Sequence, residues 1–180
     1  MARDSTRTRV HAAVLQLVVD NGYGQLTMEG IAYQARVSKQ TLYRSWPSKS
    51  AVLFDALLER SGGAEVEIPE TGDLAADLEV LMLATVEEMT NPPMDKLLRA
   101  IATEIQSDDR LASEMSTRLL GPQLNAVTAR LARGGIADPQ EAVELLYGAV
   151  LHRWLLRTRP FTAAWVTAHV ARTLRAFEAR

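Results

Sequence analysis

The sequence contains no cysteine, and this absence excludes several kinds of protein at once. Disulfide frameworks, thiolate nucleophiles and zinc sites with cysteine ligands are impossible in this chain. Glycine and proline number only 10 and 7 among 180 residues, while hydrophobic residues make up 47%. This composition is typical of a packed globular protein rather than a disordered one. A chain of this length buries roughly 70% of the surface that its unfolded form exposes, so we expect one or two domains.

Long hydrophobic runs are absent as well. Glu, Asp or Arg interrupts the longest apolar stretches well before the roughly 18 residues that a membrane span needs. The first residues, Met-Ala-Arg-Asp-Ser-Thr-Arg, contain no hydrophobic signal region. We therefore expect a cytoplasmic protein with no membrane partner.

Motifs of catalysis and metal binding are also lacking. His11, His152 and His169 do not have the spacing of metal ligands, and no glycine-rich phosphate loop occurs. No Ser, His and acidic residue are grouped around a nucleophile motif. A helical enzyme or metal protein is the rival interpretation from another class, and no motif favours it. We expect no enzymatic activity and no cofactor.

The charge is unevenly distributed along the chain, although the net charge is only −2. Residues 1–50 contain seven Lys and Arg against three Asp and Glu, and residues 51–180 contain 13 against 19. Chance partition of a mixed surface could produce such a difference. The same difference gives the N-terminal segment the positive charge that binding to DNA phosphates requires.

Residues 26–49 have the pattern of a helix-turn-helix. Thr27 can cap a short helix that ends near Ala35, and Ser38 can cap a second helix, because their hydroxyls accept hydrogen bonds from first-turn amides. Pro47 disfavours helical geometry at Trp46 and so ends the second helix.

The second helix of this motif has one apolar and one polar face. Val37, Leu42 and Trp46 are expected to pack inward. The polar face has the size that a DNA major groove admits. Its residues are Lys39, Gln40, Thr41, Tyr43 and Arg44.

Two further helices complete the predicted N-terminal domain. The first contains Val10 to Val18 at helical spacing, with Ser5 as its expected cap and Asn21-Gly22 as its stop. The other starts after a Ser48 cap and reaches about Ser61. Gly62-Gly63 begins the clearest linker in the chain. We therefore predict a DNA-binding domain at residues 1–62 and a second domain at residues 63–180.

The second domain is also predicted to be helical, so the fold class is all-α. The expected helix starts are Asp73, Asp108 or Asp109, Asp138-Pro139-Gln140-Glu141 and Thr162. We expect one helix to be interrupted at Gly121-Pro122 and to stop at Gly134-Gly135. The last two helices are apolar on more than one face. Association with a second copy would bury the extra face, and burial within one domain is the alternative.

The segment from about Arg7 to Leu58 resembles the DNA-binding domain of TetR-type transcriptional regulators. The resemblance lies in Leu-Thr-Met-Glu-Gly-Ile-Ala at 26–32 and in Val-Ser-Lys-Gln-Thr-Leu-Tyr-Arg-Ser-Trp-Pro-Ser-Lys at 37–49. It implies an all-helical homodimer, a small-molecule effector site in the C-terminal domain, and repression relieved by that effector. The alternative is a helix-turn-helix regulator whose C-terminal domain binds a protein partner. The sequence leaves repressor and activator equally open.

The resemblance also assigns residues to DNA contact. Thr27 matches the helix cap that touches phosphate, Lys49 matches the basic start of the helix that clamps the backbone, and residues 39–44 match the recognition surface. A two-fold dimer of such domains reads double-stranded DNA with a palindromic operator. Arg36 occupies a turn position where the family often has Gly. Arg3, Arg7 and Arg9 could form an arm toward the minor groove, or could be basic for solubility alone.

For the effector pocket the candidates are apolar residues of the second domain together with a few polar ones. For each of them, a place in the ordinary core is the favoured alternative, because Met and aromatic side chains at helical spacing usually fill space. The candidates are Met82, Met89, Leu98, Ile101, Met115, Gln123, Tyr147, His152, Trp154 and Trp165.

Overall fold

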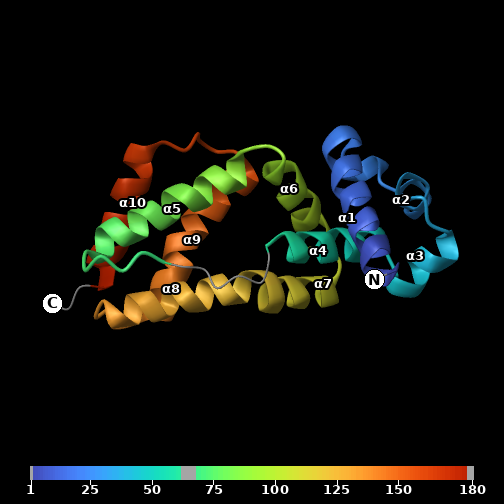
Figure 1. Ribbon diagram of the computed structural model, residues 1–180. Coiled ribbons are helices and arrows are strands. Elements are labelled where there is room, and N and C mark those ends of the chain that lie inside the picture. Colours follow the sequence, from blue (N-terminus) through green and yellow to red (C-terminus); the bar gives the residue numbers. More distant parts are fainter. Residues whose placement is uncertain (1, 62–67, 178–180) are drawn as a thin grey trace. The chain divides into compact units, whose positions relative to one another are not determined.

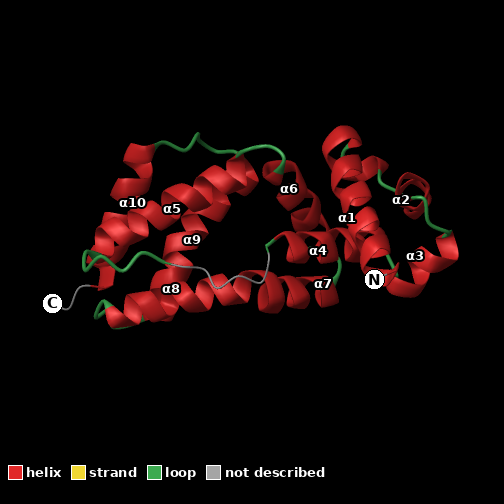
Figure 2. Ribbon diagram, in the orientation of Figure 1, coloured by secondary structure: helices red, strands yellow, loops and turns green. Residues whose placement is uncertain are grey.

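The computed structural model describes residues 2–61 and 68–177, and all secondary structure in those two ranges is helical (Figures 1 and 2). The all-α prediction is confirmed. The contacts divide the chain into two compact units, one of Met1–Ala64 with Pro92–Leu119 and one of Glu65–Asn91 with Leu120–Arg180. Within the described ranges, no helix is both long and apolar enough to cross a membrane. The predicted linker glycines, Gly62 and Gly63, lie outside the described residues.

The first unit is built around α1, which packs against α2, α4 and α6. Its core contains the fully buried Val14, Ile31, Leu42, Leu53 and Ile101. In chain order its elements are α1 (Ala2–Asn21), the 3-10 turn η1 (Tyr23–Gln25), α2 (Met28–Ala35), α3 (Lys39–Ser45), α4 (Lys49–Arg60), α6 (Met94–Glu104), α7 (Asp109–Glu114) and the start of the π-helical turn η2 (Met115–Leu120).

Three predicted caps of this unit are confirmed. The hydroxyl oxygen of Thr27 accepts a hydrogen bond from the amide of Gly30 at 3.0 Å. The Ser38 hydroxyl accepts from the Thr41 amide at 3.0 Å. The Ser48 hydroxyl accepts from the Ala51 amide at 3.2 Å. These bonds satisfy first-turn amides and fix where α2, α3 and α4 begin.

The expectation that α1 begins after a Ser5 cap is wrong, because α1 already starts at Ala2. Arg3, Arg7 and Arg9 all lie within this helix, and their contact with the minor groove stays a prediction. Arg7 donates to the Asp55 carboxylate of α4 at 2.8 Å, and this contact holds the first turns of α1 against the domain.

The second unit contains α5 (Leu74–Thr90), α8 (Gly121–Arg133), α9 (Pro139–Leu156) and α10 (Ala163–Phe177). α9 packs against α5, α8 and α10. The Asp73 and Asp138 caps are confirmed, since each carboxylate accepts from a first-turn amide at 3.0 and 3.1 Å. The core includes the fully buried Leu78, Leu131 and Leu146.

The predicted interruption at Gly121-Pro122 is wrong. The chain stays helical from α7 through η2 into α8, and Pro122 lies in the first turn of α8. Proline has no N–H to donate to the preceding turn. The π-helical turn directly before α8 widens the helix at the point where that donor is missing, so the proline shifts the hydrogen-bond pattern without ending the helix.

Candidate nucleic-acid interface

The turn between α2 and α3 has a left-handed residue at its centre. Arg36 has φ 54° and ψ 49°, and its amide donates to the Tyr33 carbonyl at 3.1 Å. The next amide, of Val37, donates to the Ala32 carbonyl at 3.0 Å. This position therefore needs the conformation that glycine adopts most easily, and a non-glycine residue there costs about 1 kcal/mol or more.

α3 presents its polar face to solvent. Leu42 is fully buried and the Trp46 side chain is only 8% exposed. Gln40 and Arg44 are exposed, Tyr43 is 50% exposed, and the Lys39 side chain is 62% exposed. Thr41 is half-buried, with its hydroxyl 2.8 Å from that of Ser38. The structure thus brings the predicted recognition residues together on one short helix, and their contact with DNA stays a prediction.

Both lysines that are predicted to contact DNA, Lys39 of the recognition surface and Lys49 at the start of α4, have partners within the first unit. Lys39 Nζ lies 3.0 Å from a Glu29 carboxylate oxygen, and this ammonium group lowers the pKa of the Glu29 carboxyl. Lys49 Nζ donates to the Tyr23 carbonyl at 3.3 Å and lies 4.3 Å from the centre of the Tyr23 ring. Each lysine would therefore exchange an internal contact for a phosphate.

Tyr33 is an exposed aromatic residue of the motif that the sequence analysis missed. Its side chain is 85% exposed. The buried face of α2 contains Met28, Ile31, Ala32 and Ala35, and the helical period places Tyr33 on the opposite face. The sequence signal that could have found Tyr33 is its position next to the apolar pair Ile31 and Ala32, which form the inward face of the same short helix.

A cluster of charged side chains contacts Trp46, at the C-terminal end of α3. Trp46, the residue that caps the C-terminus of α3, donates its indole N–H to Asp55 Oδ2 at 2.9 Å. His11 Nε2 lies 3.0 Å from the same oxygen, and His11 Nδ1 contacts Glu59 Oε2. Sequence reasoning missed this cluster, because His11 and Asp55 are 44 positions apart and no local spacing connects them.

The effector-pocket candidates do not form one group in the structure. Ile101 and Met115 belong to the buried core of the first unit, and Leu98 is half-buried there. The other seven lie in the second unit. Among these, Met82 is buried in the core and His152 is exposed on α9.

Tyr147 is the candidate with an unsatisfied polar atom. Its hydroxyl is buried beside the side chains of Thr85 and Gln123, but it makes no hydrogen bond of good geometry to either of them. Burial raises the pKa of this hydroxyl. Trp154, on the same helix, donates its indole N–H to the Met89 carbonyl at 2.9 Å. A buried donor without a well-placed acceptor is uncommon in folded proteins, so the Tyr147 hydroxyl is a candidate polar contact for a ligand.

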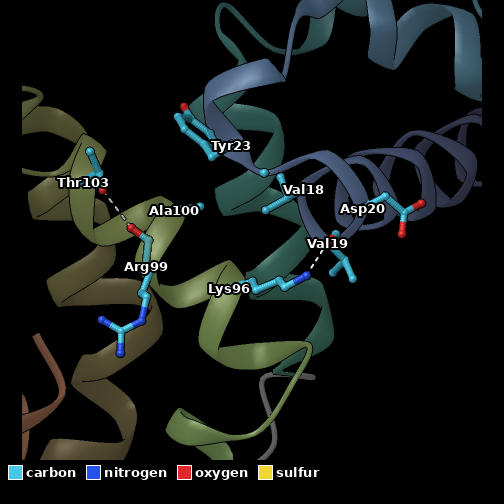
Figure 3. A pocket seen from close by; sticks show the side chains of 9 residues that line it. Val18, Val19, Asp20, Tyr23, Lys96, Arg99, Ala100 and Thr103 are labelled. Atoms are coloured by element: carbon cyan, nitrogen blue, oxygen red, sulfur yellow. Dashed lines mark hydrogen bonds between the residues drawn. The ribbon is translucent and has the colours of Figure 1, made fainter. Parts of the chain in front are cut away.

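A hollow of about 390 Å³ lies elsewhere, between the end of α1 and α6 in the first unit (Figure 3). Val18, Tyr23 and Ala100 contribute its apolar surface. Lys96 crosses from α6 to donate to the Val19 carbonyl at 2.7 Å, as Figure 3 shows. None of the ten effector candidates lines this hollow.

An all-helical chain with a capped helix-turn-helix and an exposed polar second helix defines a helix-turn-helix DNA-binding protein. Residues 11–56 match the family model for bacterial regulatory proteins of the tetR family. Residues 68–173 match the model for the tetracyclin repressor-like C-terminal domain. The chain belongs to the TetR family of transcriptional regulators.

Similar proteins are also regulators of this kind. An uncharacterized HTH-type transcriptional regulator of Mycobacterium tuberculosis, Rv1556, is 30% identical over 91% of this chain and 83% of its own. The DNA-binding transcriptional repressor TetR of Mycobacteroides abscessus is 31% identical over 74% of this chain and 70% of its own. The solved TetR family regulator SCO0332 has a TM-score of 0.73 at 34% identity, over 94% of this chain and 97% of its own. The function that follows is DNA-binding transcriptional regulation, and the family consists of regulators rather than enzymes.

Proposed function

We propose that this chain is a homodimeric repressor that binds an inverted-repeat operator and is released from it by a small apolar effector. The observation that carries the proposal is the exposed polar face of α3, supported by a buried apolar face and capped at both ends. A relative that is 31% identical is described as a DNA-binding transcriptional repressor, which favours repression over activation.

The DNA contacts divide by chemistry. Gln40 and Arg44 carry the donors and acceptors that read base edges, and Tyr43 offers a ring for a sugar or a thymine methyl group. Lys39, Lys49 and the capped start of α2 at Thr27 suit phosphates. Because Glu29 binds Lys39 in the absence of DNA, a phosphate competes with a carboxylate for this lysine.

A self-complementary face on α9 supports the dimer. Leu145, Leu151 and Leu155 are 45%, 48% and 55% exposed, and Gly148 lies among them with open space where a Cβ would be. If two copies of α9 cross antiparallel at Gly148, Leu145 faces Leu151 of the second copy, and Glu144 faces His152 of the second copy. Two apolar pairs and two pairs of a carboxylate with an imidazole then meet, one of each on either side of the two-fold axis. α10 adds small residues at helical spacing, namely Ala164, Ala168 and Ala171.

The effector site is placed at the unsatisfied hydroxyl of Tyr147 in the second unit. Gln123 and Thr85 lie near it, and Met89 is half-buried on the neighbouring α5. An apolar molecule with a single acceptor for the Tyr147 O–H fits this chemistry. A ligand shifts the operator affinity only by its difference in affinity for the two dimer states, commonly about 1 to 3 kcal/mol.

Selection of bound duplexes from a random pool, at fixed near-physiological salt, tests the DNA part. The expected result is an inverted repeat with half-sites about 34 to 36 Å apart. The Gln40→Ala variant should then lose base preference, and Lys49→Ala should weaken binding to all sequences and lower the salt slope by about 1. Arg110→Ala is the matched control, since this exposed arginine on α7 pairs with Glu114. Recovery of no motif by the wild-type chain would overturn the proposal.

Sedimentation tests the α9 face. Leu151→Asp should convert a dimer to a monomer, because two carboxylates would meet the second copy's leucines. Val80→Asp is the matched control, because Val80 is 56% exposed on α5. A wild-type chain that sediments as a monomer would instead favour a protein partner for the exposed leucines of α9.

A further inference from the structure

The hollow between the end of α1 and α6 lies wholly within the first unit (Figure 3). Its volume of about 390 Å³ falls within the range of small-molecule sites, roughly 300 to 1,000 Å³. Gly22 leaves the rim of the hollow open, because this residue follows α1 with φ 78° and an added Cβ would meet no atom within 4 Å. The hollow therefore has room for a small ligand.

One side of the hollow is apolar. Val18 and Ala100 are buried there, and the ring of Tyr23 adds an aromatic surface. Arg99 also lines the hollow, but its Nε donates to the Asp95 carboxylate at 2.8 Å, and Figure 3 shows its guanidinium directed away from Tyr23. Such a lining favours a ligand with an apolar body.

Lys96 brings a positive charge to the edge of the hollow. Its Nζ donates to the Val19 carbonyl at 2.7 Å (Figure 3). Val19 lies in the last turn of α1, where carbonyls lack donors from their own helix, so Lys96 caps this helix end. An ammonium group has three N–H donors, and the Val19 carbonyl occupies one of them. A carboxylate can therefore accept from Lys96 without breaking the cap.

The other polar residues of the lining leave room for such an anion. Asp20 supplies the only carboxylate among the lining residues. It accepts from Gln16 Nε2 at 2.8 Å, and its side chain points away from Tyr23 in Figure 3. The Thr103 hydroxyl donates to the Arg99 carbonyl at 2.9 Å. One ammonium group beside an apolar wall matches a ligand with a single carboxylate at one end.

Tyr23 connects the hollow to the start of α4. Its ring centre lies 4.3 Å from Lys49 Nζ, and its carbonyl accepts from the same ammonium group at 3.3 Å. Its hydroxyl is buried beside Ser50 of α4 and Glu104 of α6, and this burial raises the pKa of the hydroxyl. A ligand packed against Tyr23 therefore holds the residue that Lys49 must leave in order to contact a phosphate.

We propose that the hollow binds a small apolar carboxylate, with the carboxylate on Lys96 and the apolar part against Val18 and Tyr23. Its binding keeps Lys49 on Tyr23 and lowers the affinity for DNA. The site differs from the one proposed at Tyr147 because it lies in the first unit and requires a negative charge. The effect on DNA rests on the proposed function, whereas binding of the carboxylate is a property of the chain without DNA.

Titration of the full chain with hexanoate, without DNA, tests the site. Hexanamide is the neutral comparison, since it has the same apolar body and no carboxylate. Saturation transfer to the ligand protons, measured by NMR, gives both affinities. Hexanoate should bind about tenfold more tightly, because a hydrogen bond between two charged groups is stronger than one to a neutral amide. Equal affinities, or no binding of hexanoate, overturn the site.

Variants assign the binding to the hollow. Lys96→Met removes the ammonium group from an exposed position and keeps a stem of similar length, so the hexanoate affinity should fall to that of hexanamide. Ala100→Leu fills the hollow from α6 and should lower the affinity at least as far, with circular dichroism to check the fold. Arg110→Met is the matched control, because it removes an exposed positive charge on α7 that pairs with Glu114. Wild-type affinity in Lys96→Met overturns the site.

The effect on DNA is measured by fluorescence anisotropy with a duplex recovered by the selection described above. Saturating hexanoate should lower the duplex affinity by roughly three- to tenfold, and the duplex should lower the hexanoate affinity by the same factor. Sodium acetate at equal concentration controls for salt, because it adds the same charge without the apolar body. Lys96→Met should lose the response to hexanoate, and Arg110→Met should keep it.

The remaining outcomes separate the site from the proposed function. Hexanoate binding that depends on Lys96, with no duplex bound by any variant, supports the site and counts against DNA binding as proposed. The same binding with an unchanged duplex affinity overturns the connection through Tyr23 and Lys49.

Discussion

The two units each contain a charged cluster, and the clusters differ in how far they are exposed to solvent. In the first unit the cluster is centred on His11, with Asp55, Glu59 and Arg7 partly exposed to solvent. In the second unit Asp77 and Arg130 are 1% and 4% exposed, and their closest atoms are 2.6 Å apart.

The cluster of the second unit is closed by further hydrogen bonds. Asp77 accepts from the amide of Thr71 at 3.2 Å and from its hydroxyl at 2.7 Å. Arg130 also donates to the Pro69 carbonyl at 3.4 Å. Burial by itself would raise the pKa of Asp77, but the bonds from Arg130 and Thr71 hold it below its usual value. The comparison teaches that the first unit holds the end of its recognition helix with a partly exposed cluster, while the second has a buried structural pair.

Removal of one partner of the buried pair is expected to have the largest effect. Arg130→Ala leaves the Asp77 carboxylate buried without its counter-charge, so the thermal midpoint should fall by roughly 10 °C or more. Arg133→Ala is the control three residues away, because Arg133 pairs with Glu70 at the surface, where both side chains are more than half exposed. Exposed pairs contribute little, and circular dichroism should show almost no change. Similar midpoints for the two variants would show that the Asp77 cluster does not stabilise the second unit.

Loss of an indole N–H donor should lower the stability by a smaller amount. Its effect on DNA binding should differ between the two units. Trp46→Phe removes the N–H that Asp55 accepts and keeps an apolar ring, at a cost of about 1 kcal/mol in urea unfolding. Trp154→Phe makes the matching change in the second unit, where the N–H bonds to the Met89 carbonyl at 2.9 Å. Both should lose similar stability, but only Trp46→Phe should weaken duplex binding measured by anisotropy. Equal loss of binding in both variants would mean that the Asp55 contact has no specific role in holding α3.

The smallest expected change in stability near neutral pH comes from titration of the Asp77 carboxyl. Its pKa is lowered in the folded chain, so its stabilising contribution is complete above the ordinary aspartate value and is lost as the pH falls through the lower, folded value. Between pH 5 and pH 8 it should change nothing, and below about pH 4 it should decline. Urea midpoints across this range check the prediction, with Asp77→Asn as the comparison. An acid-side loss of the same size in Asp77→Asn would assign that loss to other carboxylates.

The structural features that could be predicted from the sequence are those that depend on residues close together in the chain. Caps such as Thr27 and Ser38 act over three positions, and α3 ends at Ser45, directly before Trp46-Pro47, as the rule for residues before proline requires. The exposed face of α3 follows from the helical period once those ends are known. Consequently the helix-turn-helix and the all-α class could be predicted without coordinates.

The remaining features depend on residues that only the folded chain brings together. Arg130 and Asp77 are 53 positions apart, and Arg7 and Asp55 are 48 apart, so no pattern of spacing reveals either pair. The helical path through Gly121-Pro122 was missed for a different reason, because a π-helical turn absorbs the missing donor of Pro122.

Arg36, in the left-handed turn between α2 and α3, has a consequence at the level of the gene. Every arginine codon becomes a glycine codon when its first base is replaced by G. A less strained turn is therefore one point mutation away from this chain at any time. Because glycine at position 36 is one base change away, the lack of a mutational route to glycine does not explain why arginine is found there.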